Sequence, residues 1–466
     1  MATLILTTVG TAIGGPIGGA LGAIAGGAID GTLMRPAARN GPRLSELRVQ
    51  TSSYGAEIPQ LFGTIRVAGT VIWATDLIET RATDGGGKGA PDTVRYSYSA
   101  SFAVLLSARA IRGVRRIWAD GNLLRGAAGD FKSATDFRLY TGGEAQAPDP
   151  LIASAVGIAR ATAMRGQAYA VFEGMALADY GNRIPSLTFE VEADEAPVGG
   201  GAIAAALASG VAGEAGLTPP LDGFSAHGGS RRDVVAMLAM TGGGWFAPAG
   251  ERIELRAGEG AAVAVADSGH GGSTAVHRVA AADHAPRAVT LAHYDAARDY
   301  QAGLQRAVRP GGGWREQHVE LPAVMPAPVA KAMAASLLVR AEADRWRRRV
   351  HIGWEGLSIR PGDRVCVQGD TTPYRVTGWN LEAMAVELEL APIAVVTASG
   401  AASPGNPVVT PDRSHGATIL IAAELPPLSG ALPTRPQIAV LAAGTAPGWR
   451  GTTLLASDDG GASWQA

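Results

Sequence analysis

The N-terminal segment of this chain carries glycine at every fourth position. Residues 2–29 contain no charged side chain, and the repeat consists of Gly10, Gly14, Gly18, Gly22 and Gly26. In an α-helix, residues four apart lie on one face, and glycine there lets a second backbone approach closely. The spacing therefore predicts a helical segment that packs against itself, against copies of itself, or into lipid.

Four interpretations of this segment stay open. A secretory signal needs a basic start, whereas the first basic residue is Arg35. A resident membrane helix needs about 20 apolar residues, which are present. However, glycine is a weak helix former in water, and Pro16 interrupts the run. The other two interpretations are a helical hairpin buried in an oligomer and a membrane segment that stays hidden until it is triggered.

Composition narrows the class of protein. Of the 466 residues, 18% are charged and 47% are hydrophobic, against about 25% charged residues in ordinary domains. This balance favours extensive surface buried between chains. The net charge of −2 gives no global basic field for nucleic acid. The single Cys366 excludes a disulfide or a cysteine-based metal site within this sequence, and it fits synthesis in the cytoplasm.

Short apolar runs separated by glycine-rich turns predict a β-rich α+β protein with several domains. Residues 61–74 are interpreted as a hairpin centred on Gly69, and residues 94–107 as a strand that enters a core. Residues 117–124 read as two strands joined by an Asp-Gly turn.

Two longer helices are expected in the second half of the chain. Residues 231–240 follow Ser230, a good N-cap, and residues 328–349 form the second helix. That second helix ends in an arginine cluster formed by Arg345, Arg347, Arg348 and Arg349. We interpret the cluster as a solvated or interface face, with contact to DNA as the alternative.

Sequence motifs for phosphate binding and for serine hydrolysis are incomplete. Residues 84–89 resemble a phosphate-binding loop, but they lack its first glycine and the Ser or Thr after Lys88. In residues 223–227, His227 stands where a serine-hydrolase elbow needs glycine. We therefore expect neither activity.

Acidic and histidine residues give equally weak signals for catalysis or metal binding. Asp120, Glu173, Asp179 and Asp363 are the carboxylates that acid/base chemistry would use, but each lies beside glycine or in a turn, where Asp commonly caps the backbone. His277 and His284 do not have the spacing of a metal motif. We predict no catalytic, metal-binding or cofactor-binding residue.

The C-terminal part contains one Asp-box, the Ser-x-Asp-x-Gly-x-x-Trp hairpin motif of sialidase propellers, at residues 457–464. Its role there is structural. One copy predicts a β-hairpin in a unit whose closing strand is not present, which indicates that the natural chain continues.

Several spaced strings together carry a family resemblance. They are residues 53–69 with Trp73, residues 96–103, 116–121, 139–150, 165–169 and 181–191, and the Pro-Gly-Asp turn in residues 360–365. Their order resembles the hub proteins of long-tailed phages and of gene transfer agents, which form a phage tail protein family. The hubs of contractile phages and the host-specificity J protein of phage lambda are more distantly similar. The resemblance covers roughly residues 1–392.

The resemblance implies a homotrimer at the tip of a tail tube, with two tail-tube-like β-barrel domains per chain continuing the tube as a pseudo-sixfold ring. The implied partners are the tail tube, the tape measure protein, distal fibre or receptor-binding proteins, DNA in transit and the host membrane. The family-signature residues, structural in role, are Tyr54, Gly55, Ile58, Pro59, Gly63, Arg66, Trp73, Trp118, Asp120, Gly121, Gly181, Asn182 and Pro185.

On this basis we expect five regions. They are a Gly-rich apolar plug or penetration segment (1–34), a first hub barrel region with an insertion (35–195), a helix-containing hub domain (196–290), a helix plus second hub barrel (291–395), and a linker with the start of a C-terminal β domain (396–466). The predicted function is a non-enzymatic hub that caps the tube and gates DNA exit. The alternatives are a cell-envelope-degrading tail enzyme and a membrane-anchored adhesin.

Overall fold

The structure is a computed structural model. It describes residues 57–84, 93–132, 135–180, 183–209, 211–213, 217, 219–257, 260–269, 276–382, 384–393, 400–406, 412, 417–424, 438–445, 449, 452, 454, 456 and 457. The glycine repeat of residues 10–26 and most of the Asp-box lie outside the described residues, so their predictions stay untested.

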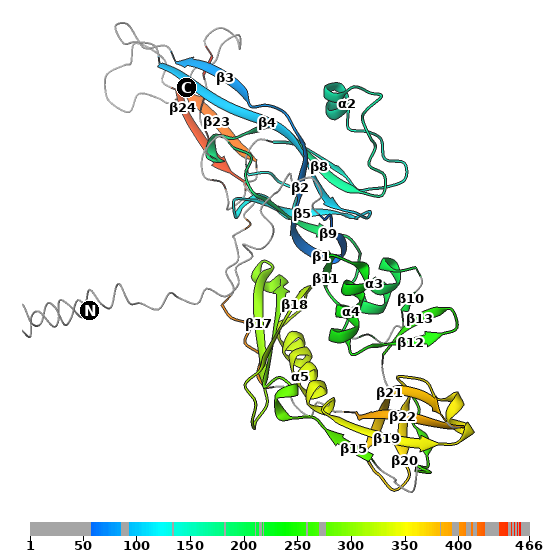
Figure 1. Ribbon diagram of the computed structural model, residues 1–466. Coiled ribbons are helices and arrows are strands. Elements are labelled where there is room, and N and C mark those ends of the chain that lie inside the picture. The colour runs from blue at the N-terminus through cyan, green and yellow to red at the C-terminus, as the bar shows by residue number, and fades with distance from the viewer. Residues whose placement is uncertain are drawn as a thin grey trace, which may run out of the picture. The chain divides into compact units, whose positions relative to one another are not determined.

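Two sheets pack face to face in the first part of the described chain (Figure 1). One side consists of four neighbouring strands of an eight-stranded sheet, namely β1 (Gln60–Ala68), β9 (Leu187–Glu192), β5 (Gly113–Ala119) and β6 (Asn122–Arg125). The other sheet contains β2 (Thr70–Ala74), β3 (Ile78–Asp84), β4 (Thr93–Ser107), β8 (Ala168–Ala176) and β7 (Asp136–Tyr140). Alternate residues of both sheets point inward, and Ile65, Phe102, Ile117, Phe172 and Phe189 form the centre of their shared core.

Strand β1 contributes to two hydrophobic cores, and its two halves pair with different strands. Residues 60–63 pair with β11 (Gly223–Ala226), whereas residues 64–68 pair with β9. The change occurs at Gly63, which has φ +62°, and a Cβ there would lie 2.3 Å from the backbone oxygen of Asp222. Only glycine fits that backbone conformation in so little space.

On the side of residues 60–63, the eight-stranded sheet continues into a part that is covered by helices. Its strands are β11, β18 (Glu316–Val324), β16 (Ala288–Asp295) and β17 (Gln301–Val308). The core that they share with the helices α3 (Gly200–Leu207), α4 (Arg231–Gly242) and α5 (Ala327–Ala343) includes Phe224, Leu238, Leu291 and Leu338. Helix α5 packs against β16 and β17 of this sheet, and Figure 1 shows it beside β17.

Three further sheets and one short α-helix complete the strands and α-helices of the described residues. A six-stranded sheet has the order β14 (Val263–Val265), β20 (Arg364–Val367), β21 (Pro373–Glu382), β22 (Ala385–Pro392), β19 (Trp346–Ile352) and β15 (Val276–Val279). A three-stranded sheet contains β10 (Val211–Gly213), β13 (Arg252–Arg256) and β12 (Trp245–Ala249). The strands β23 (Thr418–Glu424) and β24 (Ile438–Gly444) pair with each other, and α2 (Pro150–Val156) follows β7.

The predicted β-rich α+β class is confirmed, as are several local elements. Helix α4 begins after Ser230, whose Oγ accepts a hydrogen bond from the backbone of Asp233 at 3.2 Å. Strands β5 and β6 form the predicted hairpin around Asp120 and Gly121, both with positive φ. Among the described residues no sheet closes into a barrel, and no helix of that part of the chain is long and apolar enough to cross a membrane.

Two local predictions are wrong. Residues 61–74 do not form a hairpin, because β1 pairs with β9 and β11 while β2 pairs with β4, so the chain passes from one sheet to the other at Gly69. The second long helix ends at Ala343, and most of the arginine cluster lies on strand β19. Every second residue of this strand, Arg348, Val350 and Ile352, is buried, which is the two-residue period of a β-strand with one face in a core.

Candidate functional site

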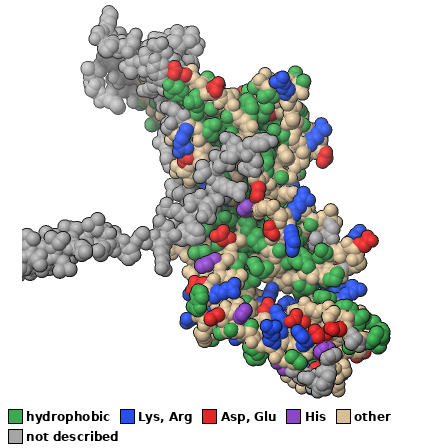
Figure 2. Space-filling view, in the orientation of Figure 1, with side chains coloured by type: hydrophobic (Ala, Val, Ile, Leu, Met, Phe, Trp, Pro, Cys, Tyr) green, Lys and Arg blue, Asp and Glu red, His purple; other side chains and the backbone are tan. Residues whose placement is uncertain are grey.

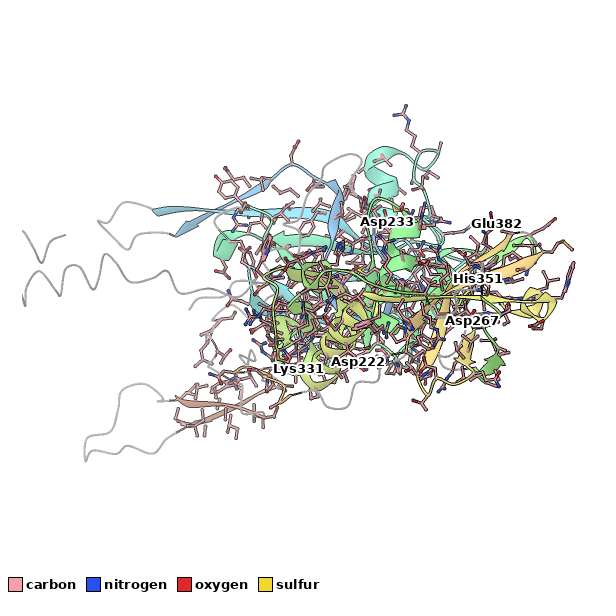
Figure 3. The ribbon with its side chains drawn as sticks, turned by 60° about the horizontal axis from the view of Figure 1, so that its bottom comes forward. Asp222, Asp233, Asp267, Lys331, His351 and Glu382 are labelled. Carbon is pink, nitrogen blue, oxygen red and sulfur yellow. The ribbon has the colours of Figure 1, made fainter. Side chains whose placement is uncertain are left out.

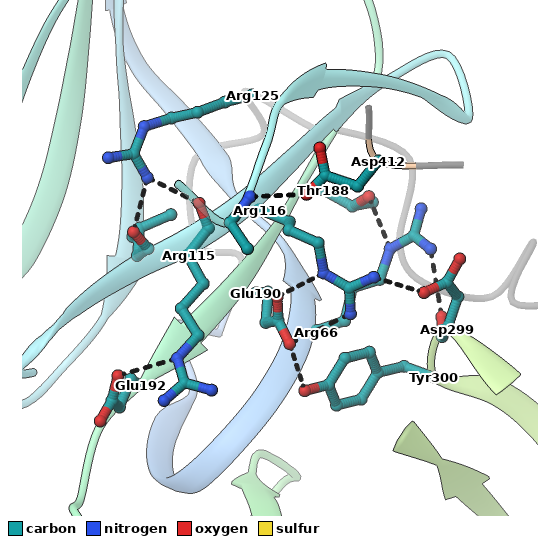
Figure 4. Close-up of polar contacts among 12 residues, drawn as sticks. Arg66, Arg115, Arg116, Arg125, Thr188, Glu190, Glu192, Asp299, Tyr300 and Asp412 are labelled. Atoms are coloured by element: carbon teal, nitrogen blue, oxygen red, sulfur yellow. Dashed lines mark hydrogen bonds and ion pairs between the residues drawn. The ribbon is translucent and has the colours of Figure 1, made fainter. Parts of the chain in front are cut away.

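A group of buried charged side chains links the first sheet pair to the helix-covered part of the chain (Figure 4). We call it the polar junction and define it as Arg66, Arg116, Glu190, Asp299 and Tyr300. The first three side chains come from β1, β5 and β9, and the last two from the connection between β16 and β17. The junction therefore joins residues that are up to 233 positions apart in the sequence.

Arg116 is the centre of the polar junction. Its Nε donates to Glu190 Oε2 at 2.7 Å and its Nη2 to Glu190 Oε1 at 3.2 Å, while its Nη1 donates to Asp299 Oδ1 at 2.6 Å. The side chains of Arg116, Glu190 and Asp299 are 16%, 7% and 5% exposed. Such a bidentate, charge-assisted pair is geometrically specific and is poorly screened by salt.

Arg66 and Trp118 complete the packing around Arg116. The guanidinium carbon of Arg66 lies 3.8 Å from the centroid of the Trp118 ring, and that of Arg116 lies 4.8 Å from it. Arg66 also donates to Thr188 Oγ1 at 2.9 Å and to the backbone oxygen of Asp299 at 3.2 Å. Trp118 is fully buried, so these cation–π contacts occur away from water, where they are strongest.

The turn that supplies Asp299 and Tyr300 has an unusual backbone. Both residues have positive φ, at 53° and 61°, a region that non-glycine residues seldom adopt. Tyr300 Oη donates to Glu190 Oε1 at 2.7 Å, and Arg66 and Arg116 both bond Asp299. These contacts offset the cost of the turn conformation.

Burial and neighbouring charges shift the pKa values of the polar junction. Burial lowers the pKa of Arg66 to about 10, against the raising effect of Asp299. Burial also raises the pKa of Tyr300, and the nearby Glu190 raises it further. For Glu190, burial alone would raise the pKa, but the hydrogen bonds from Arg116 and Tyr300 outweigh it and lower the pKa. Arg66, Glu190 and Tyr300 thus keep their usual charge states at neutral pH, as a static ion-pair network requires.

The predicted signature residues fall into separate places in the structure. Arg66 and Trp118 belong to or contact the polar junction, and Gly63 forms the bend in β1. Ile58 and Trp73 pack on the outer face of the β4–β8 sheet. Asp120 bonds the backbone of Ser186 at 2.9 Å and Arg183 at 3.0 Å.

Of the other signature residues, three have roles in the backbone or the interior near their own position, and four lie outside the described residues. The Pro59 carbonyl accepts a hydrogen bond from Ala108, Gly121 completes the Asp-Gly turn, and Pro185 is buried. Tyr54, Gly55, Gly181 and Asn182 lie outside the described residues.

Of the five residues of the polar junction, sequence reasoning singled out only Arg66. Arg116 and Glu190 lay in the spaced strings but were not singled out, and Asp299 and Tyr300 lay in none of them. No local signal distinguishes a buried Asp-Tyr pair from an ordinary polar turn, because the charges that hold it come from strands more than 100 residues away.

A second buried carboxylate explains the string at residues 139–150. Asp149 caps α2 and accepts hydrogen bonds from Arg138 Nε and Tyr140 Oη, both at 2.8 Å. Gln146 bonds four backbone groups across the same loop. These contacts order the segment between β7 and β8.

The carboxylates considered for catalysis are bound in structural contacts or exposed. Glu173 pairs with Arg138 at 2.6 Å, Asp363 accepts from the backbone of Arg360 at 2.8 Å, and Asp179 is exposed. Ser225 Oγ lies 3.2 Å from His227 Nδ1.

Titratable side chains are distributed over many elements. In Figure 3, Asp233 lies on α4, Lys331 on α5 and His351 on β19. On the face shown in Figure 2, acidic and basic side chains are interspersed. Within the described ranges, no three His, Cys, Asp or Glu side chains are grouped to hold a metal ion.

Part of the chain matches a family of tail proteins, and its fold is similar to that of a solved virion chain. Residues 231–379 match the family described as "Putative phage tail protein". The chain is similar in structure to a chain of the virion of a native gene transfer agent particle, with a TM-score of 0.62 and 24% identity over 84% of this chain and 98% of that chain. Among curated proteins, none is significantly similar in sequence.

Two crystal structures of tail proteins are more distant. The tail protein of Neisseria meningitidis MC58 matches with a TM-score of 0.32 and 11% identity over 68% of this chain and 96% of that chain. The 43 kDa tail protein of prophage MuSo2 from Shewanella oneidensis matches with a TM-score of 0.29 and 10% identity over 68% of this chain and 97% of that chain. Both likenesses are too weak to support a shared fold. The chain therefore has the fold of a gene transfer agent virion chain, and its residues 231–379 match a phage tail protein family.

Proposed function

We propose that this chain is the structural hub of a phage or phage-like tail tip. In this proposal three copies cap the tail tube, connect it to the tape measure protein and to distal fibre or receptor-binding proteins, and gate the exit of DNA. The protein is made in the host cytoplasm, acts in the virion and carries out no catalysis.

The observation that carries the proposal is the fold similarity to a gene transfer agent virion chain, which extends over 98% of that chain. The family match of residues 231–379 supports a tail role independently, from sequence. The two tail-tube-like barrels per chain remain part of the proposal, because the sheets described here are open and a ring would have to complete them.

The polar junction suits a part of a particle that must resist deformation. Several short, charge-assisted hydrogen bonds with specific geometry join strands β5 and β9 to the turn at Asp299 and Tyr300. A hub must keep its parts in one orientation while it contacts several partners, and this contact set supplies such rigidity within one chain.

Cryo-electron microscopy of the assembled particle tests the hub proposal. We expect density for three copies of this fold around the tail axis, at the end of the tube. A copy number other than three, or a position along the tube wall or in the head, would contradict it.

The glycine repeat is proposed to act as a plug in or below the channel and to enter the host envelope on ejection. Deletion of residues 2–29 should leave tail assembly intact and abolish DNA delivery. A matched variant with Leu at Gly14, Gly18 and Gly22 keeps the length and apolar character but blocks close helix packing. Failed assembly, or full infectivity of the deletion, would refute the plug.

A further inference from the structure

A cavity of about 400 Å³ lies between helices α4 and α5 and the six-stranded sheet. Its walls come from Trp245 and Phe246 after α4, from Leu337 and Arg340 on α5, and from Arg375 on β21, among others. The cavity is within the size range of small-ligand sites, about 300–1,000 Å³. It is separate from the polar junction, with which it shares no residue.

The cavity holds more positive charge than the described carboxylates neutralise. Arg340 and Arg375 both line it, together with the single carboxylate of Asp344. Asp344 Oδ1 is 3.9 Å from Arg375 and 3.3 Å from Arg347, which lies outside the cavity lining. In the described part of the chain, Arg340 forms no salt bridge and bonds two neutral acceptors, the Met240 carbonyl and Ser336 Oγ.

Electrostatic effects on Arg340 agree with this excess. Burial lowers the pKa of Arg340, and the charge of Arg375 lowers it further, against the raising effect of Asp344. Two guanidinium groups that repel each other in a partly buried space gain free energy when an anion lies between them.

The ring of Trp245, which lines the cavity, carries a buried donor without an acceptor in the described part of the chain. The indole Nε1 of Trp245 is buried and has no hydrogen-bond partner among the described residues. Gly362 holds the Pro-Gly-Asp turn against this ring, and a Cβ at that position would lie 1.6 Å from Nε1. A buried donor left unpaired costs about 1–3 kcal/mol, so such groups commonly mark a missing water or ion.

We propose that this cavity binds a small organic anion through its phosphate or carboxylate group. Arg375 and Arg340 contact the anionic oxygens, and the Trp245 ring forms part of the wall. The apolar side chains of Met240, Phe246 and Leu337 line the same space and accommodate an apolar body.

Isothermal titration calorimetry on the full chain tests this proposal. Sodium phosphate and sodium benzoate are titrated separately, against sodium chloride at matched ionic strength, because screening alone changes surface electrostatics. We expect saturable binding of one equivalent of at least one probe. Phosphate alone would assign a phosphate ligand, and benzoate alone a carboxylate attached to an apolar body.

Variants separate specific binding from non-specific attraction. Arg375→Gln should weaken binding about tenfold or more, since hydrogen bonds to charged groups are the stronger ones. Arg375→Lys retains the charge but loses the planar fork and should be intermediate. Arg349→Gln is the matched control, because Arg349 pairs with Glu387 on the same sheet but outside the cavity.

The thermal midpoint of each variant without anion verifies its folding, and Arg375→Lys remains informative where Arg375→Gln is unstable. Absence of saturable binding by either probe would overturn the proposal. Equal affinity of wild type and the folded Arg375 variants would overturn it as well. Neither result depends on whether the chain is a tail hub, because the measurement uses the purified chain.

Discussion

The polar junction and the cavity near Trp245 both contain two arginines, but they differ in the carboxylates that surround them. In the polar junction, Arg116 by itself bonds two carboxylates, those of Glu190 and Asp299, and its three hydrogen bonds to them are 3.2 Å or shorter. In the cavity, Arg340 and Arg375 share one carboxylate whose nearest contact to them is 3.9 Å. The polar junction thus has one carboxylate for each arginine, whereas in the cavity two arginines share one carboxylate.

This difference teaches how arginines can be assigned to structure or to binding in a chain without catalytic motifs. A buried guanidinium that is hydrogen-bonded to carboxylates fixes how the surrounding segments are oriented, and its removal leaves buried charges unpaired. A guanidinium held beside another guanidinium can be removed at little cost, because its neighbour then experiences less repulsion. The following predictions test that contrast, from the largest expected effect to the smallest.

Arg116→Ala should reduce the free energy of unfolding by about 3–5 kcal/mol, because Glu190 and Asp299 would stay buried without their partner. Urea denaturation followed by tryptophan fluorescence measures this change. Arg115→Ala is the matched control, since Arg115 is the neighbouring arginine, 54% exposed and paired with Glu192. Its effect should stay within about 1 kcal/mol. Equal effects of the two variants would show that the polar junction contributes no special stability.

Tyr300→Phe removes one hydrogen bond to Glu190 and keeps the ring, so we expect a loss of about 1–2 kcal/mol. Tyr98→Phe provides the comparison, because Tyr98 donates to Glu79 at 2.9 Å in an exposed setting. Thermal unfolding of both variants should show a clearly larger decrease for Tyr300→Phe. A larger decrease for Tyr98→Phe would contradict the importance of burial here.

The acid stability of the chain should depend on Glu190. Its pKa in the folded chain is below the usual 4.5, so its contribution is fully present above pH 4.5 and is lost as the pH falls through the lower folded value. Glu190→Gln should therefore flatten the acid side of a plot of stability against pH. Glu192→Gln, which removes a carboxylate paired with exposed arginines, serves as its control. An unchanged acid limb in Glu190→Gln would count against this contribution.

Arg375→Gln should change the free energy of unfolding by no more than about 0.5 kcal/mol in the absence of anion. Relief of repulsion with Arg340 offsets the loss of the weak contact to Asp344. Chemical denaturation in a chloride buffer measures this value. A loss as large as that of Arg116→Ala would mean that the two regions do not differ as described.

Local sequence patterns predicted those parts of the fold that depend on nearby residues. The Asp-Gly turn at residues 120–121 and the Ser230 cap are set by backbone conformations and hydrogen bonds within a few positions. The β-rich class follows in the same way from short apolar runs between turns. The spaced strings also identified Arg66 and Trp118, which lie at the polar junction.

The errors in prediction arise where distant segments decide the local structure. Gly69 suggested a turn, but the pairing partners of β1 and β2 are different strands, so the chain changes sheets there. Residues 346–352 contain helix-compatible arginines, yet they form β19 because β22 and β15 supply ladder partners on both sides.

By itself, the sequence determined the α+β class, the Asp-Gly turn at residues 120–121 and the resemblance to tail hubs, since these depend on periodicity and on residues close in the chain. The tertiary structure alone decided which charges are neutralised. Arg116 meets Asp299 across 183 positions, and Arg340 and Arg375 face one cavity from two different elements. Electrostatic free energy depends on distance and burial in space, which the order of residues along the chain does not specify.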